Sequence, residues 1–196
     1  NDIIVKNNNF QKSSCGIHLY GSTSNDIVDN DFNNTQIGIR LWNSNFNNVN
    51  LNYIRNSNII NEELTDGGIY LIGSYANNIF ENVIVNGNTG IFLSEGVHSN
   101  TISINTIENN NVGIKCSEDR ENTIANNIFI GNIQTIILSQ SFFNIFTGND
   151  FQSSELLLIK STFSISFISK VTNNWHGDPK PRMDTKLSLI FINIPI

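Results

Sequence analysis

Two short sequence phrases recur in step along this chain, and their common period constrains the fold more than any other feature. The first is Gly-Ile-x-Leu, which begins at Gly16, Gly38, Gly68 and Gly90, with variants that begin at Gly113 and Thr135. The second is Asn-x-Ile/Phe-x-x-Asn-x-Ile/Phe, which begins at Asn25, Asn77, Asn100, Asn122 and Asn144. Successive copies of the first phrase are 22, 30, 22, 23 and 22 residues apart. Two interleaved phrases with one period indicate a repeat fold in which each coil is covered by its neighbours.

Within each phrase apolar residues alternate with polar ones in very short runs, which is the periodicity of β-strands. Three such strands per coil, joined by tight turns, predict an all-β fold: a right-handed single-stranded parallel β-helix with about 22 residues per coil and about seven coils. Leucine-rich repeats and helical solenoids are disfavoured, because the chain shows neither a second Leu pattern nor a 3.6-residue apolar period. The coils are expected over residues 1–177, and all 3 prolines fall in a separate C-terminal segment, 178–196.

The turns carry their own chemistry. Asparagine at the coil corners is expected to adopt the left-handed turn conformation and to form amide ladders between coils. Glycine before the first strand is expected to serve unusual backbone angles. The 30-residue coil holds eight extra residues, and we expect about five of them near residues 43–50 and three near 60–67.

Charge and composition exclude some partners. The net charge is −6 with only 11 Lys and Arg and no basic run, so electrostatics disfavour nucleic acid. No stretch approaches the ~20 apolar residues of a membrane span. The chain has no initiator Met and no signal-peptide pattern, which predicts a fragment or a trimmed mature protein. Its uncapped coil rims are then available for end-to-end contacts.

The repeat phrases resemble those of the NosD-like parallel β-helix family, whose members are described as periplasmic copper-binding, carbohydrate-binding or sugar-hydrolase domains. The similarity covers roughly residues 1–177. The segment Asn173–Asp178, followed by Pro179–Arg182, resembles the Asn-x-Trp closing motif and the Pro/Arg-rich tail of archaeal members, without their usual Asn-Tyr-Trp order. The resemblance implies an exported protein that is secreted, periplasmic or on the cell surface. It implies no single activity, because such coils also serve lyases, hydrolases, adhesins and surface scaffolds.

Strand alternation assigns two outward columns of side chains. If Ile17 and Leu19 point inward, the residues between and after them point outward, as do their equivalents in later coils. One column contains His18, Arg40, Tyr70, Phe92 and Lys115, and the other contains Tyr20, Trp42, Ile72, Ser94 and Ser117. The predicted ligand-binding residues are therefore Tyr20, Trp42, Tyr70, Phe92, Arg40 and His18. Coils ~4.8 Å apart would make them a flat platform suited to sugar rings. Alternatively, these aromatic residues stack only on one another or pack beneath a loop.

Carboxylates gather at two turns. Glu62, Glu63 and Asp66 precede Gly68, while Glu118, Asp119 and Glu121 follow Cys116. Glycoside cleavage needs two carboxylates about 5–10 Å apart, and Glu95 and Glu118 occupy similar offsets on adjacent coils. The candidate catalytic residues are Glu95, Glu118, Glu62, Glu63 and Asp66. A lyase would instead use such acids to hold Ca²⁺ beside a basic residue. The plainer interpretation is that all of them are solvated turn acids.

Ligands for a soft metal ion are few. His18, His98 and His176 are the 3 histidines, Met183 is the 1 methionine, and Cys116 is expected to point inward. His18 and His98 lie more than three coils apart, so they cannot share one ion. We therefore expect no copper site in this chain, despite the name of the family, and no cofactor.

These observations favour an exported, non-catalytic or weakly catalytic β-helix that binds polysaccharide or cell-surface glycan on its aromatic residues. Two alternatives remain open. The first is a polysaccharide lyase or glycoside hydrolase that uses the turn acids, and the second is a structural surface or assembly scaffold whose coils act as spacers.

Overall fold

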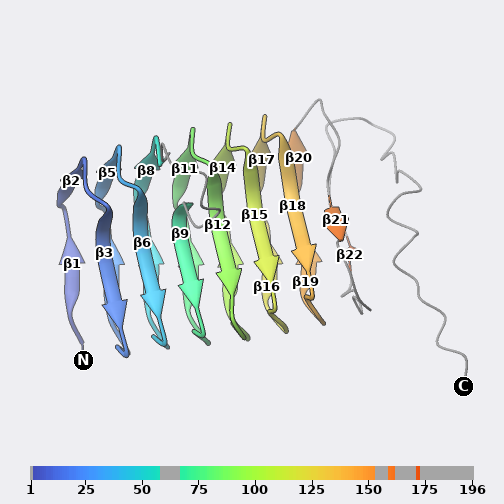
Figure 1. Cartoon of the computed structure of the whole chain (residues 1–196), viewed down its shortest axis with the longest axis horizontal. Helices are drawn as coiled ribbons and strands as arrows, with labels where there is room; N and C mark the ends of the chain where they lie inside the picture. The colour runs from blue at the N-terminus through green and yellow to red at the C-terminus, as the bar shows by residue number, and fades with distance from the viewer. Residues whose placement is uncertain (1, 58–66, 153–158, 162–170, 173–196) are drawn as a thin grey trace, which may run out of the picture.

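The computed structural model of the chain describes residues 2–57, 67–152, 159–161 and 171–172. Its backbone is the predicted parallel β-helix, in which short strands stack in sequence order along the long axis of the molecule (Figure 1). Three sheets of eight, seven and seven strands run along this axis, in agreement with the expected seven coils. The described residues contain no helix that is long and apolar enough to cross a membrane. The predicted segment 178–196 lies outside the described residues.

Each coil contributes one strand to each sheet, and we name the sheets A, B and C in chain order. Sheet A contains β1 (Ile4–Lys6), β4 (Asp26–Val28), β7 (Asn48–Asn50), β10 (Asn78–Phe80), β13 (Thr101–Ser103), β16 (Thr123–Ala125), β19 (Ile145–Thr147) and β22 (Val171–Thr172). Sheet B contains β2 (Asn9–Gln11), β5 (Asp31–Asn33), β8 (Tyr53–Arg55), β11 (Val83–Val85), β14 (Thr106–Glu108), β17 (Ile128–Ile130) and β20 (Asp150–Gln152). Sheet C contains β3 (Cys15–Tyr20), β6 (Ile37–Trp42), β9 (Gly67–Ile72), β12 (Thr89–Ser94), β15 (Val112–Ser117), β18 (Gln134–Ser139) and β21 (Ile159–Ser161).

The core is a set of aliphatic and aromatic columns that run along the inside of the solenoid. In sheet C, Ile17 pairs with Ile39 and Ile39 with Ile69, and the column continues to Ile136. Sheet B supplies a column in which Phe32 and Phe129 are fully buried. Each inward side chain therefore packs on its equivalents one coil away, which is how a short strand with little core of its own becomes stable.

Buried asparagine ladders line two corners. The ladder between sheets A and B runs through Asn30, Asn52, Asn82 and Asn105, and each amide nitrogen donates to the next Oδ1 at about 3.0 Å. The expected ladders are confirmed. The expected left-handed conformation occurs at corner asparagines outside the ladders, such as Asn43 (φ 48°) and Asn126 (φ 56°), but not at the ladder asparagines themselves. The residue before a ladder asparagine takes it whatever its type, as Leu51 (φ 57°) does. Hydrogen bonding between coils therefore selects asparagine at these corners.

The glycine that begins the first phrase also has a different role from the expected one. A Cβ on Gly38 would lie 2.6 Å from the backbone oxygen of Gly68 and 2.8 Å from Cγ2 of Ile54. Gly38 is not among the residues with positive φ. Glycine is needed here because two backbones and a core side chain approach closely, and not because of unusual backbone angles.

The insertion in the 30-residue coil also differs from the expectation of two sites. Asp26 pairs with Asn48 and Asp31 with Tyr53, so residues 43–50 follow the ordinary register without extra residues. All eight extra residues therefore fall between Arg55, at the end of β8, and Gly67, at the start of β9. The sequence pattern missed this coil because Val49 fills the inward place that Ile or Phe takes in other copies.

Candidate functional site

The two outward columns have the predicted register. In the first, His18 pairs with Arg40, Arg40 with Tyr70, Tyr70 with Phe92, and Phe92 with Lys115. In the second, Tyr20 pairs with Trp42, and the column continues through Ile72 and Ser94 to Ser117. The six predicted ligand-binding residues therefore do lie on one outer face, that of sheet C.

Exposure divides this face into two parts. Tyr20 is 64% exposed and Trp42 38% exposed, whereas Tyr70 and Phe92 are only 6% and 7% exposed. The rings of Tyr70 and Phe92 stack in parallel at 4.8 Å, and the Tyr70 hydroxyl lies 3.1 Å from Oγ of Ser94. The expected open platform over four coils is thus exposed only on β3 and β6, because Tyr70 and Phe92 form a buried stack of the kind that stabilises sheets.

A cation lies at each end of the buried stack. The guanidinium carbon of Arg40 is 5.8 Å from the centre of the Tyr70 ring, and Nζ of Lys115 is 4.6 Å from the centre of the Phe92 ring. Burial lowers the pKa of Lys115. Arg40 therefore belongs to both parts of the face, since it packs on Tyr70 on one side and pairs with His18 on the other.

We define the aromatic face as His18, Tyr20, Arg40 and Trp42. The rings of Tyr20 and Trp42 meet edge to face with centres 5.5 Å apart, while His18 stacks on Trp42 at 6.2 Å. Partial burial, followed by the charge of Arg40, lowers the pKa of His18. The imidazole is therefore neutral at neutral pH and offers one donor and one acceptor beside two exposed rings.

The candidate catalytic acids have different outcomes. Ser94 and Ser117 are register partners at the ends of β12 and β15, so Glu95 and Glu118, which follow them, lie in adjacent coils at the same corner. Both are exposed. Glu62, Glu63 and Asp66 lie outside the described residues.

Asp119 is the residue at this corner that sequence reasoning misjudged. Expected as a solvated turn acid, it is 1% exposed. Its carboxyl accepts hydrogen bonds from Nδ2 of Asn122 at 3.0 Å and Nδ2 of Asn144 at 3.4 Å. Burial raises the pKa of Asp119, although hydrogen bonds that include those of Ser141 and Cys116 oppose the rise. Burial, together with the nearby Asp119 carboxyl, also raises the pKa of the Cys116 thiol.

An alignment of the coils could have predicted that Asp119 is buried. The corner after sheet C has its own asparagine ladder, formed by Asn25, Asn47, Asn77, Asn100, Asn122 and Asn144. Three residues before each of these asparagines, the chain has Ser22, Ser44, Ser74, Val97, Asp119 and Ser141 in successive coils. The serines of this column are buried or half-buried, and Ser74 is 0% exposed. Aligning the coils on the ladder asparagine therefore identifies Asp119 as the only acid in an otherwise small or apolar buried column.

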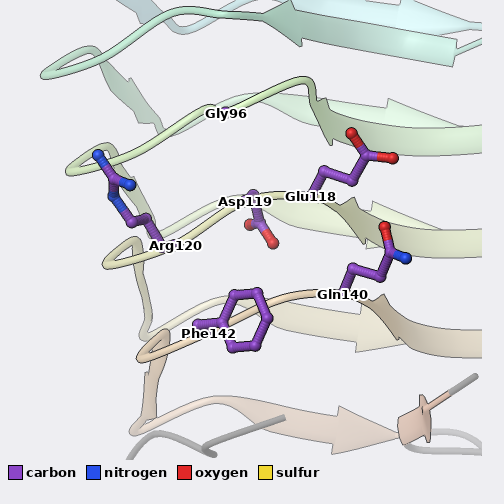
Figure 2. Close-up of a pocket in the computed structure, with 6 residues that line it drawn as sticks. All are labelled: Gly96, Glu118, Asp119, Arg120, Gln140 and Phe142. Carbon is purple, nitrogen blue, oxygen red and sulfur yellow. The ribbon is translucent and has the colours of Figure 1, made fainter. Parts of the chain in front are cut away.

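A hollow of about 370 Å³ opens at the same corner. We call it the corner hollow, and it is lined by Gly96, Glu118, Asp119, Arg120, Gln140 and Phe142 (Figure 2). The Asp119 carboxyl points toward the coil of Phe142, whereas Glu118 and Gln140 project side by side from the turns that follow sheet C. The extra residue of the 23-residue coil lies here, since Asn100 is six positions after Ser94, whereas Asn122 is five positions after Ser117.

No metal centre emerges from the described residues, in which no three His, Cys, Asp or Glu side chains gather closely enough to hold an ion. His18 lies on the outer face of sheet C, and His98 stacks on Tyr75 at 5.0 Å in the corner after it. His176 and Met183 lie outside the described residues.

Known proteins resemble this chain in two ways. The family model described as "Periplasmic copper-binding protein (NosD)" matches residues 1–157, whereas no curated protein matches the sequence. Similar solved structures include the A-module of mannuronan C-5 epimerase AlgE6 from Azotobacter vinelandii, with a TM-score of 0.47 and 8% sequence identity. The match covers 91% of this chain and 59% of that one, so this chain spans less than two thirds of its length.

Proposed function

The chain belongs to the NosD family, and from the geometry of its outer surface we propose that it binds polysaccharide or cell-surface glycan through the aromatic face. The observation that carries this proposal is the exposed pair of Tyr20 and Trp42, whose rings meet at 5.5 Å on adjacent coils. Their exposure is a departure from the rest of sheet C, where Tyr70 and Phe92 are buried.

The chemistry of the aromatic face suits an uncharged polyol. A pyranose ring has an apolar face and a rim of hydroxyls, and Tyr and Trp combine an apolar ring with a polar atom. Neutral His18 can donate to one hydroxyl and accept from another. Arg40 is half-buried and its guanidinium carbon lies 5.8 Å from the centre of the Tyr70 ring, so the guanidinium is held in place and loses little freedom on binding.

The family description also supports a proposal about location. NosD proteins are described as periplasmic, and we propose that this chain is exported as well, to the periplasm, the cell surface or the medium. An exported protein meets polysaccharide directly, which agrees with the proposed ligand.

Copper is the other ligand that the family description names, and the described residues do not fit it. Imidazole, thiolate and thioether are the ligands that copper prefers. Cys116 is completely buried beside Asp119, and His18 and His98 lie on different elements with no further ligand gathered around either. We therefore derive no step through copper from this part of the chain.

Affinity electrophoresis in gels that contain a panel of neutral and acidic polysaccharides tests the proposal. Trp42→Ala and Tyr20→Ala are each expected to weaken retention about tenfold, because each removes an exposed ring that stacks on sugar. Tyr53→Ala is the matched control, since Tyr53 is 41% exposed but lies on sheet B. Unchanged retention of both Trp42→Ala and Tyr20→Ala would remove the idea.

A catalytic role is the second candidate, because Glu95 and Glu118 are exposed in adjacent coils at the same corner, where Glu118 and Arg120 line the corner hollow. It predicts that polysaccharides retained by the protein are also shortened, with new reducing ends or new double bonds. Glu118→Gln would abolish that release while leaving retention by the aromatic face intact. Retention without any release favours a binding protein.

A further inference from the structure

The outer face of sheet C differs from the other two outer faces in its charge. From β3 to β18 its charged side chains are Arg40 and Lys115, and these strands contain no acid. The described outer faces of sheets A and B do carry acids, which are Asp26, Asp31, Glu108 and Asp150. A chain with a net charge of −6 therefore presents one cationic face, and the local field of such a face attracts anions.

Arg40 has no carboxylate partner among the described residues, in which the ion pairs are those of Arg55 and Arg120. In the same part of the chain, Nε of Arg40 is buried and has no hydrogen-bond partner. No acid occurs in the turns on either side of β3 and β6, which are residues 12–14, 21–25, 34–36 and 43–47. A partly desolvated guanidinium without a counter-ion is stabilised when an anion binds beside it.

The charge of Arg40 acts on its neighbours in the direction that favours an anion. Partial burial lowers the pKa of His18, and the charge of Arg40 lowers it further. Burial raises the pKa of the Cys15 thiol, and the same charge opposes that rise. In both cases Arg40 favours the less positive form of the neighbouring group. An anionic ligand at this place gains from the same interaction.

Arg40 is also close enough to the exposed rings to contact the same ligand. Arg40 and Trp42 point outward from β6 two residues apart, so their Cβ atoms are about 7 Å apart. Stacking on Tyr20 and Trp42 needs only the apolar face of a sugar ring, which neutral and acidic sugars both have. The choice between neutral and acidic glycans therefore falls to Arg40.

We propose that the aromatic face selects acidic glycans, in which a sugar ring packs on Trp42 and a carboxylate or sulfate of the same glycan pairs with Arg40. The guanidinium fork matches either anionic group through two parallel hydrogen bonds. This inference rests on the proposed function and adds the ligand class. A glycan without acidic groups leaves Arg40 without a counter-ion and binds more weakly.

Isothermal titration with two matched pairs of oligosaccharides tests this inference at neutral pH and low salt. The first pair is the α-1,4-linked tetramer of galacturonic acid and its full methyl ester, and the second is a sulfated carrageenan tetramer and its desulfated form. The wild-type chain is expected to bind the acidic member of at least one pair about tenfold more tightly than the neutral member. The pair that shows this preference identifies the anionic group. Equal binding of the two members in both pairs would overturn the inference.

Three substitutions test the assignment to Arg40. Arg40→Gln should weaken binding of the preferred acidic tetramer about tenfold and leave binding of its neutral form unchanged. Arg40→Lys keeps the charge but loses the planar fork, so it should weaken the acidic tetramer only about threefold. Lys6→Gln is the control for net charge, because Lys6 is exposed on the outer face of sheet A. Equal weakening by Lys6→Gln and Arg40→Gln would show diffuse attraction and would overturn the inference.

The proposed function fails separately. If Trp42→Ala weakens both members of a pair alike and Arg40→Gln weakens neither, the aromatic face binds glycan without selecting its charge, and only the inference is wrong. If Trp42→Ala leaves every tetramer bound as before, the proposed function is wrong and the inference fails with it. If the wild-type chain binds none of the four tetramers, the inference is overturned, and retention in polysaccharide gels still decides the proposed function.

Discussion

The corner after sheet C has two versions in this molecule, a regular one in the first three coils and an altered one in the next two. In the regular version Ser22, Ser44 and Ser74 form a ladder, with the amide of Ser44 donating to Oγ of Ser74 at 3.0 Å. In the altered version Val97 has no hydroxyl and Asp119 brings a carboxyl into the same buried column. The corner hollow lies at the altered version.

This comparison shows that the turn after sheet C can vary in length and composition while the inward columns of the core stay in register. Leu71, Leu93 and Cys116 remain register partners through both versions, and all three are completely buried. Because each coil is stabilised by the inward columns it shares with its neighbours, a turn can accept an extra residue or a buried acid without loss of the fold. New sites can therefore arise at corners.

The largest expected effect concerns the regular corner. Asn77→Ala should lower the free energy of unfolding by about 3 kcal/mol, because it leaves buried partners unsatisfied. Asn77 donates to the carbonyl of Ser44 at 2.9 Å and accepts from the amide of Asn47 at 2.9 Å. Denaturant titration followed by circular dichroism measures the change.

Asn78→Ala is the matched control for this experiment, since Asn78 is the exposed neighbour and its amide bonds only at the surface. Its effect should stay below about 0.5 kcal/mol. A cost for Asn77→Ala as small as that of Asn78→Ala would contradict the structural role of the ladder.

The second effect concerns the acid of the altered corner. Asp119→Ser restores the residue of the regular version and should stabilise the protein by about 1 kcal/mol at neutral pH. Burial raises the pKa of Asp119, so the stability linked to this group is complete below the ordinary aspartate range and is lost as pH rises through the raised pKa. Melting temperatures between about pH 4 and about pH 7 should therefore fall more in the wild-type chain than in Asp119→Ser.

The reciprocal change sharpens the comparison. Ser44→Asp puts a carboxyl into the regular column, where Ser44 is 0% exposed, and should create the same loss of stability toward neutral pH. If the melting temperature of Asp119→Ser falls with rising pH as steeply as that of the wild-type chain, the buried carboxyl does not cause the pH dependence.

The third effect concerns the extra residue of the altered corner. Deletion of Gly96 restores the 22-residue spacing of the corner. The melting temperature should change little, since Gly96 lies outside the core and is exposed. A loss of stability as large as that expected for Asn77→Ala would mean that the altered turn supports the fold.

The smallest effect is electrostatic and lies on the aromatic face, at the other end of the molecule. Partial burial and then the charge of Arg40 lower the pKa of His18. Arg40→Gln should raise that pKa part of the way to its ordinary value, since the burial contribution stays. NMR titration of the imidazole measures the shift, and a fall in the pKa of His18 would contradict the assigned cause.

Much of the fold follows from the order of residues alone. The alternation in Gly-Ile-x-Leu and the common period of the two phrases predicted the parallel coils, the inward columns and the outward pairing of Tyr20 with Trp42. These features depend on spacing, because a strand with period two and a coil of constant length allow one register that stacks every apolar residue inward. Part of the eight-residue insertion was wrongly predicted near residues 43–50, because Val49 stands where the other copies of the second phrase have Ile or Phe.

Burial at the surface and at the corners was decided by tertiary structure. Tyr20 and Tyr70 are both outward aromatic residues on sheet C, yet one is exposed and the other is buried. Asp119 looks like its exposed neighbour Glu118 in the sequence but lies against Asn122 and Asn144, the second of which comes from the next coil. The physical reason is the same in each case: exposure depends in part on residues a full coil away in the chain, such as Phe92 for Tyr70 and Asn144 for Asp119, and the period alone does not specify which atoms they present.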